Sequence, residues 1–103
     1  MDLRQKKAIK NIKECASYEI GGLENDLMDY GEDEKEYQEA KKILSDRKRL
    51  AEYVYMYATS QWYHGGGWVS FGAKAQEEIR DINFCGKEWL LAQCEKAVEE
   101  EGY

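Results

Sequence analysis

The fold is decided by residues 3–44, LRQKKAIKNIKECASYEIGGLENDLMDYGEDEKEYQEAKKIL. Apolar residues recur through the first part of this stretch at steps of three and four, which is the spacing of an amphipathic helix. The positions that form this stripe are Ile9, Ile12, Ala16, Ile20, Leu23, Leu27 and Tyr30. The spacing predicts one long helix from Leu3 to about Met28.

Two adjacent glycines, Gly21 and Gly22, are poor helix formers within this predicted helix, but they do not interrupt its apolar pattern. Each costs about 1 kcal/mol relative to alanine inside a helix. The apolar stripe nevertheless passes from Ile20 to Leu23 without a change of phase, so we predict a single helix rather than two. A bend or a close helix contact is the ordinary explanation for the pair, and a ligand site is the rarer one.

A second helix is expected after the turn at Gly31, because a glycine followed by acidic residues suits the end of one helix and the start of the next. The following stripe has the 3.5-residue spacing of a coiled coil. Its members are Tyr37, Ala40, Leu44, Arg47, Ala51, Val54 and Ala58. Two long helices joined by a short turn fold back on each other as an antiparallel hairpin. Arg47 is charged, so it should reach solvent or pair with a carboxylate.

The character of the sequence changes at residues 62–68, WYHGGGW. Three consecutive glycines end a helix, so we expect a loop here, with residues 69–71 extended. The glycines would let the chain reverse and gather four rings into one cluster: Trp62, Tyr63, Trp68 and Phe71. This cluster either caps the helices or forms an exposed anchor for a partner. Helical spacing returns over 73–82 and again from Trp89 to Gly102, which makes residues 1–103 a single all-α domain.

Composition narrows the class of function. The chain has 15 basic and 21 acidic residues and a net charge of −6, which disfavours contact with nucleic acid and acidic membranes. It contains no apolar run of the roughly 20 residues that span a bilayer, and no signal peptide. Its three cysteines form an odd set without a CxxC motif, which favours a reducing compartment. We therefore expect a cytoplasmic protein.

Acidic residues are concentrated around the first turn, where eight acids and one base lie between Glu24 and Glu39. This run is either a solvated turn or a displayed row of carboxylates that competes with phosphate for a basic groove on another protein. The partner-binding residues predicted here are Asp26, Asp29, Glu32, Asp33, Glu34 and Glu36. The aromatic residues of 62–71 are predicted to bind the same partner.

Basic residues gather over 4–13 and 41–49, on the two helices of the predicted hairpin. Like charges would meet where these segments lie side by side. The acids of the last helix could relieve this by packing across the basic end, although exposed pairs contribute only about 0–1 kcal/mol each. These acids are Glu95, Glu99, Glu100 and Glu101.

No catalytic or metal-binding arrangement is recognisable. His64 is the only histidine and has no neighbouring base or nucleophile, so an exposed loop histidine is the simpler interpretation. The glycine run lacks the Lys-Ser/Thr of a phosphate-binding loop. Cys15 and Cys94 are expected to be buried thiols, and the role of Cys85 stays open. We predict a protein that is not an enzyme and has no cofactor or metal.

The stretch KKAIKNIKECASYEIGGLENDLMDYGEDEKEYQEAKKIL and the closing GKEWLLAQCEKAVEEEGY resemble small proteins encoded by phages and mobile elements of gut bacteria. This resemblance implies a setting in which short acidic proteins, anti-CRISPR proteins among them, inhibit host defence proteins. The main hypothesis is an acidic inhibitor that presents carboxylates in place of phosphates to a nucleic-acid-handling host protein. The alternative is a self-associating structural or regulatory protein, for example a homodimer.

Overall fold

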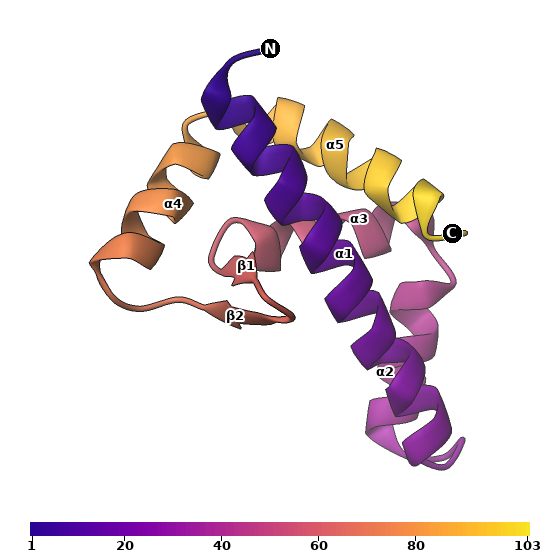
Figure 1. Ribbon diagram of the computed structural model, residues 1–103. Helices are drawn as coiled ribbons and strands as arrows, with labels where there is room; N and C mark the ends of the chain where they lie inside the picture. The colour runs from indigo at the N-terminus through magenta and orange to yellow at the C-terminus, as the bar shows by residue number, and fades with distance from the viewer.

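The computed structural model describes all 103 residues and has five helices and one small sheet. The elements are α1 (Leu3–Asp29), α2 (Lys35–Leu44), α3 (Arg47–Ala58), β1 (Trp62–His64), β2 (Gly67–Val69), α4 (Ala73–Asn83) and α5 (Lys87–Glu100). Helix α1 crosses the molecule, with α4 and the β1–β2 hairpin on one side and α5 on the other (Figure 1). The predicted mostly helical class is confirmed.

Helix α1 confirms the prediction of one uninterrupted element. Asp2 caps its first turn by accepting from the backbone N–H of Gln5, while the Gln5 side chain accepts from the backbone N–H of Asp2. The helix continues through Gly21 and Gly22, and a Cβ atom added at either glycine would meet nothing within 4 Å. The close helix contact considered for this pair is therefore wrong.

The second long helix is instead two helices, so the predicted hairpin of two unbroken helices needs correction. The chain leaves the helical path at Asp46, whose backbone is extended (φ −130°, ψ 108°). The Asp46 carboxylate accepts from the backbone N–H groups of Lys48 and Arg49 and thereby starts α3. Helix α2 packs beside α1, whereas α3 packs against both α1 and α5. Arg47 is exposed, and its Nε donates to the backbone oxygen of Tyr103 at 2.8 Å.

The glycine-rich segment forms a β-hairpin rather than the predicted loop. Strands β1 and β2 are antiparallel, with Tyr63 paired to Trp68 and His64 paired to Gly67. Gly65 and Gly66 both have positive φ angles, 58° and 82°, as a two-residue type I′ turn requires. Residues 70 and 71, expected to be extended with residue 69, lie outside the strand.

The core lies between α1, α3 and α5, with α2, α4 and the hairpin adding smaller contributions. Its largest fully buried side chains are Ile12, Leu50, Ile82, Leu90, Val54, Val98, Cys15 and Cys94. The predicted burial of two thiols is confirmed, and burial raises the pKa of Cys94 to about 12. None of the helices combines the length and apolar character needed to cross a membrane.

Candidate functional site: the acidic tip and the aromatic hairpin

The connection between α1 and α2 forms the far end of the molecule from the N-terminus (Figure 1). Local hydrogen bonds fix its shape. The backbone N–H of Tyr30 donates to Asp26 O at 3.2 Å and closes α1. The backbone N–H of Gly31 donates to Glu34 Oε2 at 2.7 Å. Glu34 is therefore partly used in holding the turn.

We call this end the acidic tip and define it by the six predicted residues Asp26, Asp29, Glu32, Asp33, Glu34 and Glu36. Asp26 is half-buried and the other five are exposed. None of the six takes part in an ion pair, because all four ion pairs of the molecule join α1 or α4 to carboxylates of α4. The acids therefore lie at a turn, as the sequence indicates, and their role in binding a partner stays a prediction.

Ion pairs with α4, not with α5, neutralise basic residues, and they do so only at the start of α1. Lys7 Nζ lies 2.9 Å from Asp81 and 3.3 Å from Glu78, and Arg4 lies 3.8 Å from Asp81. The hydrogen bond between Lys7 and Asp81 lowers the pKa of Asp81 and raises the pKa of Lys7. No acid of α5 forms an ion pair, so that prediction is wrong. The direction in which α4 folds back onto α1 decides which acids reach the basic residues.

Two apolar side chains accompany the acidic tip and were not predicted as part of a site. Met28 is 76% exposed and Tyr30 is 39% exposed. The signal for Met28 was its position off the apolar stripe of α1, whereas Tyr30 had been assigned to the stripe. Together they give the tip apolar contact area beside its carboxylates.

The four predicted aromatic residues do not form one cluster. Neighbouring residues of a strand point to opposite faces, and Trp62 and Tyr63 are neighbours in β1. Trp62 stacks on the exposed His64 with ring centroids 4.5 Å apart, whereas Tyr63 is buried against α1. Trp68 is 43% exposed on the Tyr63 face, and Phe71 is 76% exposed beyond the sheet. The single-cluster prediction failed because it treated the segment as irregular.

A buried polar residue that the sequence did not reveal, Asn11, holds the hairpin against α1. Its side-chain Nδ2 donates to Ala58 O at 2.8 Å and to Gln61 O at 3.0 Å. Its Oδ1 accepts from the backbone N–H of Tyr63 at 2.7 Å. Asn11 is 2% exposed, so these bonds form out of contact with solvent. The only signal was its place beside Ile12 on the inner side of α1.

The Tyr63 hydroxyl lies at the inner end of the hairpin, 2.8 Å from Glu19 Oε2 and 2.7 Å from Gln61 Oε1. A hydroxyl has one proton to donate, so these two acceptors compete for it. Burial raises the pKa of Glu19, and the hydrogen bond from Tyr63 offsets part of that rise. Burial also raises the pKa of Tyr63, which keeps the hydroxyl protonated.

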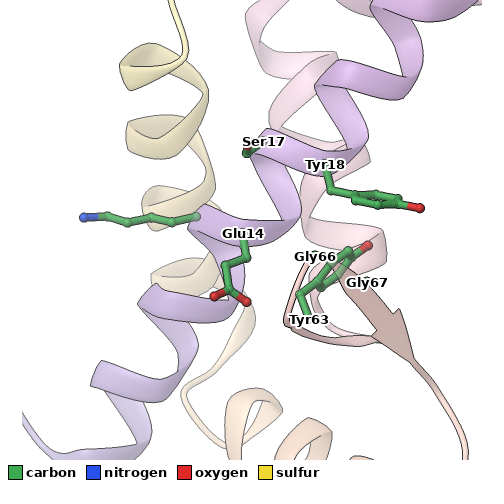
Figure 2. A pocket seen from close by; sticks show the side chains of 7 residues that line it. Glu14, Ser17, Tyr18, Tyr63, Gly66 and Gly67 are labelled. Atoms are coloured by element: carbon green, nitrogen blue, oxygen red, sulfur yellow. The ribbon is translucent and has the colours of Figure 1, made fainter.

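A pocket of about 370 Å³ opens where α1 meets the hairpin. Its lining residues are Lys13, Glu14, Ser17, Tyr18, Tyr63, Gly66 and Gly67. Figure 2 shows Glu14 and Tyr18 extending from α1 and Tyr63 extending from the hairpin. Glu14 Oε2 is shielded from solvent and has no hydrogen-bond partner. The molecule therefore has two separate features that could serve binding, the acidic tip and this pocket.

Comparisons with protein-family models, with curated proteins and with solved structures find no match to this chain.

Proposed function

We propose that this protein is a non-enzymatic binding module that presents its acidic tip to a basic surface of a partner protein. The observation that supports the proposal is the freedom of the tip carboxylates: five of the six are exposed and none forms an ion pair. Grouped acids repel one another in the folded protein, and a basic partner relieves that repulsion. The tip is thus suited to complementary charge.

The apolar side chains at the tip support a protein partner. Met28 and Tyr30 are exposed beside the carboxylates. A flexible methionine adapts to irregular apolar surfaces, and tyrosine is common among residues that dominate binding energy. Charges would speed association and select the partner, while these two side chains would add contact area.

Basic grooves that hold nucleic acid are lined by lysine and arginine, so carboxylates at the tip can occupy the places of phosphates. The proposed partner class is therefore a nucleic-acid-handling protein, and the proposed activity is inhibition by competition, as in anti-CRISPR proteins of phages and mobile elements. Three free thiols support a reducing compartment, the cytoplasm, as the place of this interaction.

The test is displacement of fluorescently labelled DNA or guide-bound target from a panel of CRISPR nucleases, followed by anisotropy. The tip variant carries Asp29→Asn, Glu32→Gln, Asp33→Asn and Glu36→Gln, and keeps Glu34 because that residue holds the turn. The control variant carries Glu95→Gln, Glu99→Gln, Glu100→Gln and Glu101→Gln, which removes the same charge from exposed positions elsewhere.

We expect the wild type and the control variant to displace the nucleic acid, and the tip variant to do so about tenfold or more weakly. The difference should shrink at high salt, because salt screens exposed charges. Equal weakening in both variants would show a general charge effect and contradict a role for the tip. Failure of the wild type against every nuclease in the panel would contradict the proposed partner class.

A further inference from the structure

The pocket between α1 and the hairpin combines a carboxylate with aromatic walls. Glu14 and Tyr18 are four residues apart on α1, so their side chains emerge on the same face of the helix. The Tyr18 ring lies 6.0 Å from the Tyr63 ring at an interplanar angle of 58°. Tyr18 is 48% exposed and lines the pocket, so part of its surface is open to a ligand.

The carboxylate of Glu14 lacks the partners that a shielded acceptor normally has. Its Oε2 is shielded from solvent, and no hydrogen bond reaches it. A buried acceptor without a donor costs about 1–3 kcal/mol, and more when it is charged. A ligand N–H that meets this oxygen, once the Glu14 side chain has turned toward the pocket, would recover that cost on binding.

Among cationic groups, a guanidinium is the one best able to bind to aromatic rings beside a carboxylate. A guanidinium group is planar, stacks on aromatic faces and donates two parallel N–H groups to a carboxylate. A lysine ammonium is more strongly hydrated and cannot stack in this way. Trp68 does not line the pocket, but it is 43% exposed on the same hairpin face as Tyr63, where it offers a ring to the rest of the ligand.

Two other charged groups bear on the pocket. Lys13 lines it and is exposed, so its flexible stem allows the ammonium group to turn into solvent when a second cation enters. Glu19 is occupied by the Tyr63 hydroxyl on the inner side of the hairpin. Glu14 is thus the carboxylate that remains available to a cation.

We propose that this pocket binds the guanidinium group of an arginine side chain presented by a partner protein, with Glu14 as its acceptor and Tyr18 as its stacking surface. The pocket is separate from the acidic tip: Glu14 and Asp29 are 15 residues apart on α1, which corresponds to about 22 Å. Arginine binding here does not depend on the function proposed for the tip, and it can be measured with a small probe alone.

The test is a titration of the ¹⁵N-labelled protein with N-acetyl-arginine amide, followed through the amide signals of Gly66 and Gly67. The comparison probe is N-acetyl-citrulline amide, which has the same shape but a neutral urea in place of the guanidinium. The binding variant is Glu14→Gln. The matched control is Glu52→Gln, which removes the same charge by the same substitution from an exposed position of α3 outside the pocket.

We expect saturable shifts of both glycine signals with the arginine probe and much smaller shifts with the citrulline probe. Glu14→Gln should weaken binding about tenfold or more, and Glu52→Gln should leave it within about twofold. A linear, non-saturating response would overturn the proposal, as would equal responses to the two probes or equal weakening by both substitutions. Thermal unfolding of Glu14→Gln should match or exceed the wild type, and a large loss would overturn the proposal by showing that Glu14 is structural.

Discussion

Asn11 links the first helix to the hairpin through three hydrogen bonds, each to a backbone group of residues 58–63. The variant Asn11→Ala would leave these groups without partners, at about 1–3 kcal/mol for each buried one. We expect a loss of about 3 kcal/mol in the free energy of unfolding, measured with urea.

The control for this prediction is Asn25→Ala, which removes the same side chain from an exposed position of the same helix. Surface substitutions of this kind change stability by about 0.5 kcal/mol or less. Similar losses in the two variants would mean that the Asn11 bonds contribute little beyond helix propensity.

Glu19 should make stability depend on pH with a definite sign. Burial raises its pKa above the ordinary value of 4.5 in the folded protein. The stabilisation that Glu19 contributes is therefore complete below pH 4.5. It is lost as the pH rises through the pKa that Glu19 has in the folded protein. Relative to Glu19→Gln, the wild type should lose stability as the pH rises from below 4.5 toward neutral.

The measurement is urea unfolding of both proteins across this pH range, with Glu52→Gln as an exposed charge control. If the wild type and Glu19→Gln curves remain parallel, Glu19 titrates alike in the folded and unfolded chains and the burial argument fails.

Sequence periodicity predicted which residues are buried. It did not predict residues whose role depends on a contact with a distant segment of the chain. Cys15 and Cys94 lie on apolar stripes, and both are buried. Asn11 and Glu14 acquire their roles only when residues 61–67 fold against α1. That contact is long-range, and a helical pattern carries no information about it.

At the scale of elements, glycine has opposite effects in α1 and in the hairpin. Gly21 and Gly22 lie in a helix with open space around them, so alanine at either position should stabilise the protein by about 0.5–1 kcal/mol. Gly66 has a φ of +82°, which alanine rarely adopts, so Gly66→Ala should destabilise the protein by about 1–2 kcal/mol. Thermal unfolding of the three alanine variants tests both the predicted gain and the predicted loss of stability. A loss of stability at Gly21 or Gly22 would show that these positions require glycine.

The break between α2 and α3 shows where a periodic pattern misleads. The apolar stripe runs through residues 37–58 without a change of spacing, so the chain was predicted as one helix. Arg47 was the departure from that stripe, and it lies where α3 begins. Asp46 is a good helix-starting residue, but its signal was weaker than the continuous stripe. The hairpin differs from the prediction for a similar reason: three consecutive glycines predict irregular structure, yet two of them form the turn of the hairpin.

At the scale of the whole molecule, exposed apolar residues are spread over several elements. Those with the greatest exposure are Met1, Leu3, Met28, Phe71 and Phe84. With a net charge of −6, copies of the chain also repel one another. We expect sedimentation to give a monomer at tens of micromolar, and a concentration-dependent dimer would favour the self-association hypothesis instead.

Helix α1 contacts α2, α3, α4, α5 and β1, and its hydrogen bonds reach as far along the chain as Tyr103. An amphipathic helix with an uncovered apolar face is only marginally stable in water. During synthesis α1 leaves the ribosome before α3 and α5, the two helices that cover its apolar face. The chain should therefore acquire its final structure only after translation has passed α5, and until then its apolar stripe is open to chaperones.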